Sequence, residues 1–405
     1  MKKLPVLSPQ RLAVKLRPAA EKAVRRGHPW VFESGIAKIS AGGKAGDLCI
    51  IFDQKKNKFL AVGLYDPHSP IRIKILQSGK SARIDTDWFT EKVKAAFALR
   101  APLLRTDTDS YRLLYGENDG MPGFIADVYA NVLVVKLYST VWLPYLRDIL
   151  PILRRTTECE VIVLRLSRLL QNLGEELHGL ADGQVLSGEL ENEEVIFREH
   201  GLRFSANVIK GHKTGYFLDH RHNRKRVGEL AKDKTVLDIF AYAGGFSVHA
   251  LAGGAKETIS LDISAQALAA AEKNVALNNL KAKHRIVAGD AFAETEKLAA
   301  QGKKFDLIIC DPPSFAKRES ERARAQESYA RLLRSVLPTL AKNGILLSAS
   351  CSARVSADEF FELNERALTE SGRKFTELER TFHDVDHPVG FAEGAYLKAV
   401  YYRVE

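Results

Sequence analysis

The chain has 405 residues, more than one ordinary hydrophobic core supports, so we expect two or three domains. Hydrophobic residues make up 45% of the sequence and charged residues 27%, a composition typical of folded globular proteins that argues against a disordered chain. No stretch approaches the roughly 18 uncharged apolar residues of a membrane span, and the segment MKKLPVLSPQR has no apolar core of signal-peptide length. We therefore expect a cytoplasmic protein that does not bind membranes.

Metal-binding patterns are absent from the sequence. His212, His220 and His222 lie near Asp219, but no fourth ligand has a suitable spacing, so we expect no bound metal. The cysteines form no CxxC pair, which argues against a disulfide framework and against a structural zinc site. They are Cys49, Cys159, Cys310 and Cys351.

Positive charge is concentrated near the N-terminus. Residues 1–83 contain 17 Lys and Arg against 5 Asp and Glu, a net charge of +12, whereas residues 84–405 sum to −2. A charge run alone is more often a solvated surface. An excess this large over so few residues instead favours a domain that binds a polyanion.

Residues 1–83 have the pattern of a small β-barrel. Apolar and polar residues alternate in RLAVKL and IRIKIL, and apolar runs of strand length are present in GDLCIIFD and FLAVGLYD. In IRIKIL, Arg72 and Lys74 occupy the outward positions of one strand face. There they would either contact phosphates or line a solvated face.

Residues 84–190 indicate a second, α+β domain. Helical spacing in WFTEKVKAAFALRAPLL is followed by a strand, turn and strand in YGENDGMPGFIADVYANVLVVKLYS, and then by the strand EVIVLRLS. No catalytic constellation is present in this segment, so we expect it to link the domains on either side.

Residues 191–405 alternate between strand and helix patterns. The helix SADEFFELNERALTE begins with a capping box formed by Ser356 and Glu359. Strands that alternate with helices predict right-handed βαβ units and a parallel, doubly wound, Rossmann-like α/β domain. The predicted strands are TVLDIFA (235–241), TISLDIS (258–264), HRIVAGD (284–290), FDLIICDPP (305–313) and GILLSAS (344–350).

Acidic residues end the first four of these strands, at the sheet edge where such folds bind ligands. One aspartate there is usually a helix cap, but four in register indicate a ligand site. Asp262 lies about 20 residues beyond the glycine turn AYAGGFS, where a carboxylate can hold a ribose diol of either NAD or S-adenosylmethionine. The full G-x-G-x-x-G pattern is missing, which is evidence against NAD as the cofactor. The expected cofactor-binding residues here are Asp238, Phe240, Ala241, Gly244, Gly245, Asp262 and Asp290.

The segment Asp311-Pro312-Pro313-Ser314 decides between the two cofactors by the family that it resembles. Its two prolines stiffen the turn that follows the strand. Here the sequence resembles class I S-adenosylmethionine-dependent methyltransferases. It is most similar to the bacterial ribosomal RNA large-subunit methyltransferase I family, which has an N-terminal PUA module and makes 5-methylcytosine in 23S rRNA. The similar motifs are HPWVFESGI, GENDGMPG, GHKTGYFLDHRHNR, LDIFAYAGGFSVHA, CDPPSF, SASCS and DHPVGFAEGAYLK.

The resemblance implies roles for individual residues. Cys351 would be the nucleophile that adds to cytosine carbon 6, and Asp311 would contact the N3/N4 edge of the base. The thiol would need positive charge nearby, for which Arg354, Lys317 and Arg318 are candidates. Lys213 and Thr214 are expected to bind the cofactor, and Arg221 and Arg224, like Arg72 and Lys74, to bind RNA.

Alternatives remain at this stage. Some RNA 5-methylcytosine enzymes carry a second cysteine after the Asp-Pro turn, where this chain has Ser314, so the base that releases the product is not identified. Methylation of an adenine amino group gives Cys351 no role. A non-catalytic RNA-binding assembly factor is the third hypothesis. Cys310, inside an apolar strand, is expected to be buried and inert, and a homodimer is one option for the assembly.

Overall fold

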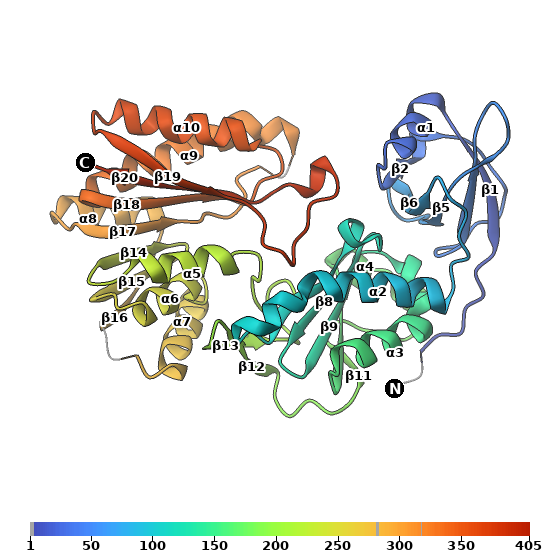
Figure 1. Ribbon diagram of the computed structural model, residues 1–405, viewed down its shortest axis with the longest axis horizontal. Coiled ribbons are helices and arrows are strands. Elements are labelled where there is room, and N and C mark those ends of the chain that lie inside the picture. The colour runs from blue at the N-terminus through green and yellow to red at the C-terminus, as the bar shows by residue number, and fades with distance from the viewer. Residues whose placement is uncertain (1–3, 281–282, 317) are drawn as a thin grey trace. The chain divides into compact units, whose positions relative to one another are not determined.

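The computed structural model describes residues 4–280, 283–316 and 318–405, and the chain divides into two compact units (Figure 1). Unit 1 comprises residues 1–198, 206–218 and 385–392, and unit 2 comprises residues 199–205, 219–384 and 393–405. In the described parts of the chain, no helix is both long enough and apolar enough to cross a membrane.

Unit 1 begins with a six-stranded mixed sheet of order β2-β6-β5-β4-β1-β3, with helix α1 (Pro18–Arg25) after the first strand. Alternate residues of β1 are buried, as the sequence pattern predicts. The strands are β1 (Arg11–Leu16), β2 (Trp30–Phe32), β3 (Ile36–Ile39), β4 (Leu48–Phe52), β5 (Phe59–Tyr65) and β6 (Ile71–Ser78).

Lys74 in strand β6 is buried, so the prediction that its side chain points outward is wrong. Lys74 is only 6% exposed, and its Nζ donates to Asp66 Oδ2 at 2.6 Å, an atom that also accepts from Ser139 Oγ at 2.6 Å. Burial alone would raise the pKa of Asp66, but the ion pair with Lys74 lowers it below its ordinary value. The partners lie 8 and 65 residues from Lys74 in sequence, so the alternation of β6 could not reveal them. Arg72 is paired with Glu33 at 2.8 Å.

Unit 1 continues with a five-stranded sheet of order β11-β10-β9-β8-β7, beside helices α2 (Thr86–Arg100) and α3 (Leu146–Thr157). Asp85 caps α2 by accepting from Trp88 N. Phe89, Trp142 and Tyr145 pack edge to face in its core. The strands are β7 (Ser110–Tyr115), β8 (Phe124–Tyr129), β9 (Val132–Leu137), β10 (Val161–Leu166) and β11 (Gln184–Ser187). A short helix, α4 (Arg168–Gln171), follows β10, and β12 (Glu194–Glu199) and β13 (Leu202–Asn207) form a two-stranded sheet.

Unit 2 contains a seven-stranded sheet of order β16-β15-β14-β17-β18-β20-β19. Strands β14 to β18 are parallel, and β20 is antiparallel to both of its neighbours, which confirms the predicted doubly wound sheet. The strands are β14 (Thr235–Ile239), β15 (Glu257–Asp262), β16 (Lys283–Ala288), β17 (Phe305–Cys310), β18 (Leu340–Ser350), β19 (Phe375–Thr381) and β20 (Lys398–Val404).

Helices cover both faces of this sheet, because its strands alternate their apolar side chains. Leu237 and Ile239 of β14 pack in the cluster with α9 and α10, whereas Val236 packs with α5 and α6. The predicted capping box of Ser356 and Glu359 begins α10. The helices are α5 (Arg221–Leu230), α6 (Gly245–Ala252), α7 (Ala265–Leu277), α8 (Ala291–Ala300), α9 (Arg322–Val336) and α10 (Ala357–Glu370).

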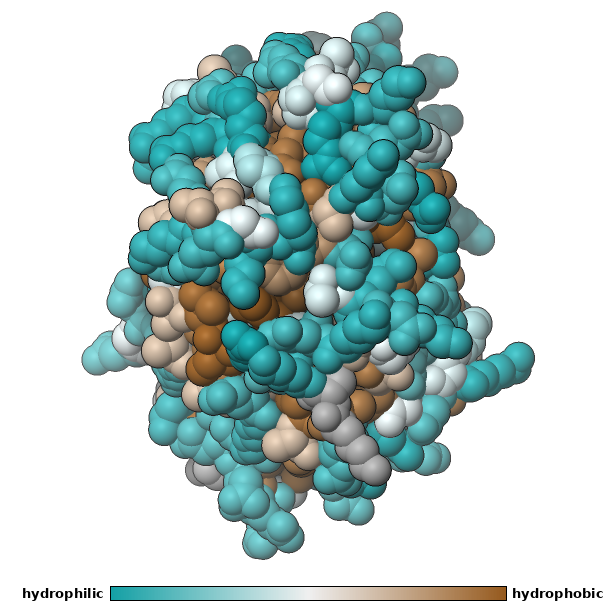
Figure 2. Space-filling model, turned by 90° about the vertical axis from the view of Figure 1, so that its left-hand side faces the viewer, coloured by the Kyte–Doolittle hydropathy of each residue, from teal (hydrophilic) through white to brown (hydrophobic). Residues whose placement is uncertain are grey.

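Figure 2 shows the face that lies at the left of Figure 1, where hydrophobic residues gather between hydrophilic side chains. Unit 2 has a cavity of about 910 Å³ near the amino ends of β17 and β18, lined by Leu337, Pro338, Leu340 and the half-buried Arg373 among others. Arg373 donates to backbone carbonyls there. The carboxyl ends of the same strands lie at the opposite edge of the sheet.

Candidate active site

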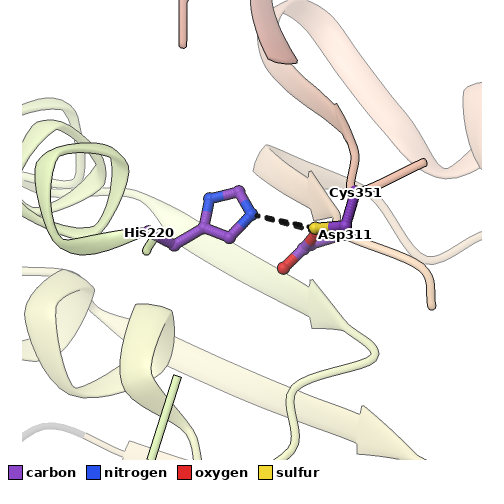
Figure 3. A group of neighbouring side chains, drawn as sticks. All are labelled: His220, Asp311 and Cys351. Carbon is purple, nitrogen blue, oxygen red and sulfur yellow. Dashed lines mark hydrogen bonds and ion pairs between the residues drawn. The ribbon is translucent and has the colours of Figure 1, made fainter. Parts of the chain in front are cut away.

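Three reactive side chains meet at the carboxyl edge of the unit 2 sheet. Asp311 and Cys351 follow β17 and β18, which are neighbours in the sheet, and His220 directly precedes α5. The side chains point toward one another (Figure 3). Cys351 Sγ lies 3.7 Å from His220 Nε2 and 3.8 Å from Asp311 Oδ1, and these two atoms are 3.3 Å apart. We call these residues the strand-end cluster.

His220 is held firmly within this cluster. It is 3% exposed, and its Nδ1 lies 3.1 Å from Asn223 Nδ2. Thr381 Oγ1 and Tyr401 OH donate to Asn223 Oδ1, at 2.6 and 3.1 Å. Burial alone would lower the pKa of His220, but the carboxylates of Asp311 and Asp219 raise it above its ordinary value. The imidazole is therefore oriented and can hold a proton.

A buried lysine adjoins the cysteine. Lys398, 2% exposed, begins β20 opposite Ser350, and its Nζ donates to the carbonyls of Ser352 and Val355 in the segment that follows Cys351. Burial lowers the pKa of Lys398 to about 8, while the charges of Cys351 and Glu359 oppose that shift. The ammonium group thus fixes the loop and places a positive charge near the thiol.

The sequence prediction had assigned this charge elsewhere. Arg354 and Arg318 are exposed, with Arg354 4.0 Å from Glu319, and Lys317 lies outside the described residues. Lys398 ends the motif DHPVGFAEGAYLK, but only the pairing of β18 with β20 shows that it adjoins Cys351. His220 lies in the motif GHKTGYFLDHRHNR, and its place beside the thiol was likewise not expected.

Cys310 provides the contrasting thiol. It lies inside β17 and is 1% exposed, as the sequence predicts. Burial, followed by the charges of Asp238 and Asp311, raises the pKa of its thiol well above the ordinary range. Cys310 is therefore unsuited to act as a nucleophile, although it is only one residue from Asp311.

Asp238 ends the first parallel strand with an incompletely paired carboxylate. Its Oδ2 accepts from the backbone N and the Oγ of Ser247, at 3.1 and 2.8 Å. Among the described residues, its buried Oδ1 has no hydrogen-bond partner. Burial raises the pKa of Asp238 to about 7, and Asp311 and Asp262 add to this shift. The group can therefore accept a further hydrogen bond.

The loop after β14 has an unusual backbone. Phe240 and Tyr242 have positive φ angles of 64° and 47°, a region that residues other than glycine rarely adopt. Gly244 has φ 70°, and a Cβ there would lie 2.7 Å from Ala271 Cβ. Asp262 Oδ2 anchors the loop by accepting from Tyr242 N at 2.9 Å. Backbone strain of this kind concentrates at ligand sites.

The remaining predicted residues of the strand ends differ in exposure. Asp290 is exposed and caps α8 through Ala293 N, and Asp262 is half-buried. Ala241 and Gly245 are buried in the loop and at the start of α6. Within the described ranges of the chain, Asp262 accepts from Tyr242 N and Ser264 N, and a carboxylate has further acceptor positions for a ligand.

The other predicted residues are Lys213, Thr214, Arg221 and Arg224. Lys213 and Thr214 belong to unit 1, where Thr214 is buried and donates to Asp127 Oδ2 at 2.5 Å. Arg221 and Arg224 belong to unit 2, are 0% and 3% exposed, and pair with the half-buried Asp384 and the buried Glu199, respectively. Their guanidinium groups therefore face the protein interior in this structure.

Two family models match the chain: S-adenosylmethionine-dependent methyltransferase over residues 113–403 and PUA-like domain over residues 14–78. A ribosomal RNA large subunit methyltransferase of Deinococcus radiodurans is 46% identical, with 99% of each chain covered. Ribosomal RNA large subunit methyltransferase I of Enterobacter sp. strain 638 is 37% identical, with 95% of this chain and 97% of the other covered.

Solved structures share the fold. A candidate S-adenosylmethionine-dependent methyltransferase from Streptococcus mutans has a TM-score of 0.81 at 22% identity, with 97% of this chain and 100% of the other covered. A candidate methyltransferase complexed with S-adenosylhomocysteine has the same TM-score and identity, with 98% and 100% covered.

The doubly wound sheet, its acidic strand ends and the match over residues 113–403 together define an S-adenosylmethionine-dependent methyltransferase. Within that class, the chain belongs to the ribosomal RNA large subunit methyltransferase I family. The expected fold class, with a PUA-like N-terminal domain and a Rossmann-like C-terminal domain, and the expected cofactor are confirmed.

Proposed function

We propose that the protein methylates carbon 5 of a cytosine in large-subunit ribosomal RNA through a covalent adduct with Cys351. The observation that carries this proposal is a half-buried thiol at the sheet's ligand-binding edge, within 4 Å of both His220 and Asp311. The proposed RNA substrate rests on relatives named as ribosomal RNA large subunit methyltransferases, which match nearly the whole chain.

The strand-end cluster has the groups that this chemistry needs. His220 Nε2 is near enough to take the proton of Cys351, and Asp311 at 3.3 Å stabilises the imidazolium that results. The thiolate then forms a bond to carbon 6 of the cytosine, and the electron pair moves toward carbon 5, which becomes nucleophilic. Carbon 5 would then take the methyl group, whose bond to the cationic sulfur would break with S-adenosylhomocysteine as the leaving group. Carbon 5 would next lose its proton to a base, and the bond between carbon 6 and Cys351 would break to restore the ring and the thiolate.

The cofactor fits the strand ends by its charge and its hydroxyl groups. S-adenosylmethionine supplies a methyl group on a cationic sulfur. We assign the ribose hydroxyls to the open acceptor positions of Asp262, and a cationic group to the unpaired Oδ1 of Asp238. The strained loop from Phe240 to Gly245 brings backbone close to the ligand, and Asp290 borders the site.

The structure favours cytosine over adenine as the methylated base. Enzymes that act on an adenine amino group need an aromatic ring after the Asp-Pro turn to stack on the base. Here Ser314 follows the turn, and its hydroxyl donates to Ala316 O. The ring of Phe315 packs against the core of unit 2, with its centroid 4.9 Å from that of Tyr329. Neither residue is placed to stack on a base, and Cys351 would have no role.

We assign RNA binding to residues 1–83, on the basis of their charge and the PUA-like match. Because Lys74 and Arg72 are paired, exposed basic residues such as Arg26 are better placed to meet phosphates. Arg26→Gln should reduce the log–log salt dependence of RNA binding by about 0.7–0.9 if it contacts one phosphate, whereas Lys74→Met should leave it unchanged. Equal slopes in both variants would contradict the assignment.

RNA that carries 5-fluorocytosine tests the adduct directly, because fluorine at carbon 5 cannot leave as a proton. With S-adenosylmethionine present, the wild-type protein should form a covalent complex that survives denaturation. The matched variants Cys310→Ala and Cys351→Ala should behave differently: the first forms the complex and the second does not. Methylation of ordinary RNA at the wild-type rate by Cys351→Ala would refute the mechanism.

A further inference from the structure

We propose that Cys351, His220 and Asp311 also form a binding site for Zn²⁺ or a similar thiophilic divalent cation, and that such an ion reversibly blocks the thiol. This goes beyond the sequence prediction of no bound metal. The binding itself is independent of the proposed reaction, and only its inhibitory consequence depends on Cys351 being the nucleophile.

The distances match a tetrahedral ion. With Zn–S near 2.3 Å and Zn–N and Zn–O near 2.0–2.1 Å, tetrahedral angles place sulfur about 3.5 Å from each of the other ligand atoms, and nitrogen about 3.3 Å from oxygen. The corresponding separations here are 3.7, 3.8 and 3.3 Å. All three ligand atoms lie within 4.8 Å of one another. Shifts of a few tenths of an ångström would complete the geometry.

The donors are of the types that Zn²⁺ prefers: a thiolate, an imidazole nitrogen and a carboxylate oxygen. Three protein ligands leave the fourth position open. His220 is buried, whereas Cys351 and Asp311 are half-buried, so an ion can reach the site from solvent. The carboxylate of Asp219 adds negative charge beside His220, which opposes the positive charge of Lys398.

Asn223 provides support behind the metal ligand. A histidine that binds zinc through Nε2 keeps a proton on Nδ1 and donates it to a neighbouring acceptor. The side-chain amide of Asn223 lies 3.1 Å from Nδ1 of His220. When its oxygen faces the ring, its nitrogen can donate to the hydroxyls of Thr381 and Tyr401, which accept as readily as they donate.

Zn²⁺ bound to Cys351 would withdraw electron density from the sulfur and occupy the space between Cys351, His220 and Asp311. Addition of the sulfur to carbon 6 would therefore be slowed, so occupancy would inhibit methyl transfer without altering the covalent structure of the protein. A chelator would restore it. The site would therefore couple this RNA-modifying enzyme to the availability of free zinc.

Cobalt titration of the full-length protein, without RNA or cofactor, tests the site. Co²⁺ replaces Zn²⁺ in tetrahedral sites, and a thiolate ligand gives it a sulfur-to-metal charge-transfer band in the near ultraviolet. We expect this band with one equivalent of Co²⁺ in the wild type, in Cys310→Ala and in His222→Asn. It should be lost in Cys351→Ala and His220→Asn, and Asn223→Ala should weaken Co²⁺ affinity at least about tenfold.

A second readout does not depend on variants that must fold. Zn²⁺ should protect Cys351 of the wild type from iodoacetamide, and a chelator should remove the protection. No thiolate band in the wild type, or a band that survives in Cys351→Ala, would overturn the proposal. A 5-fluorocytosine complex without any cobalt band would refute the metal site alone, whereas a cobalt band without the complex would refute only the proposed reaction.

Discussion

Two clusters in unit 2 use similar residue types and differ in how tightly these are paired. In the first, which we call the buried charge cluster, Glu199 accepts two hydrogen bonds from Arg224 at 2.7 and 2.6 Å and lies 3.0 Å from His249. Arg221 completes it, and all four residues are at most 4% exposed. In the strand-end cluster, the separations are 3.3–3.8 Å and two of three residues are half-buried.

The difference separates a structural from a reactive arrangement. Short, charge-assisted hydrogen bonds satisfy Glu199 and leave it no capacity to react. His220 and Arg221 are adjacent in sequence, yet His220 faces the thiol and Arg221 faces Asp384 and Glu199. The start of α5 thus contributes to both clusters, and the spacing of the partners decides which residues remain available for chemistry.

The largest expected effect is on stability, at the buried charge cluster. Glu199→Gln leaves the buried guanidinium of Arg224 without its carboxylate and removes one of the two acids near Arg221, so the free energy of unfolding should fall by about 3–5 kcal/mol. Asp311→Asn, in the half-exposed strand-end cluster, should cost less than about 1 kcal/mol while abolishing most methyl transfer. Urea unfolding measures both. Equal losses of stability would remove the distinction between the clusters.

The next effect extends the comparison to Asp262, which ends β15 on the other side of β14 from β17. Asp262→Ala should weaken S-adenosylmethionine binding by about 1.5–3 kcal/mol for each ribose hydrogen bond lost, measured by calorimetry. Asp306→Ala is the matched control, because Asp306 also accepts two hydrogen bonds, from Thr235, but at the amino end of β17. Equal affinities of the two variants for S-adenosylmethionine would show that Asp262, at the carboxyl edge of the sheet, does not bind the cofactor.

Lys398 tests whether the strand-end cluster needs its buried neighbour. Lys398→Met removes the ammonium near Cys351, so the pH at which iodoacetamide alkylates Cys351 should rise by about one unit, equivalent to about 1.4 kcal/mol. Arg354→Met, at an exposed position, should leave the profile unchanged. The measurement requires a chelator, to keep the thiol free of metal. If Lys398→Met leaves the pH dependence of Cys351 alkylation unchanged, the lysine only holds the loop in place and does not influence the thiol.

Acid should weaken the buried charge cluster gradually. Burial lowers the pKa of His249, and it lowers that of His200 to about 4, so both histidines bind protons more readily in the unfolded chain. The contribution of these two histidines to the free energy of unfolding should therefore fall as the pH drops below the ordinary histidine value of about 6.5, whereas His220 and Asp238, whose pKa values are raised, act in the opposite direction. A further fall follows as Glu199, whose pKa is lowered, takes up a proton. Urea unfolding at several pH values measures these contributions, and a pH dependence between pH 7 and pH 5 that His200→Gln leaves unchanged would contradict the assignment to His200.

The sequence predicted the sheet well because its strands are local patterns of apolar residues that end in acids. The positions of Cys351 and Asp311 at one edge of the sheet were predicted for the same reason, since each directly follows a recognisable strand, whereas the roles proposed for them came from the family resemblance. Lys398 was not found, because β20 reaches Cys351 only by antiparallel insertion beside β18. Alternation also could not show that Lys74 is buried, since its partner Asp66 lies on another segment and is itself held by the distant Ser139.

Arginines were the hardest residues to interpret from the sequence. Arg221 and Arg224 lie in a basic run that suggests contact with anions, and the structure supplies those anions from within the protein. Glu199 and Asp384 are 25 and 163 residues from their respective partners, Arg224 and Arg221, so no local pattern connects them.

The position of β20 in the sheet has a consequence for how the protein is made. Strands β18 and β19 leave the ribosome before β20, yet β20 lies between them. Until it inserts, the edge of β18 lacks its partner, and unpaired edges of this kind promote aggregation of nascent chains. Lys398 arrives with the same strand, directly opposite Ser350. Cys351 is therefore synthesised 47 residues before Lys398, so the positive charge proposed to assist the thiol is present only once the last strand of the sheet has been made.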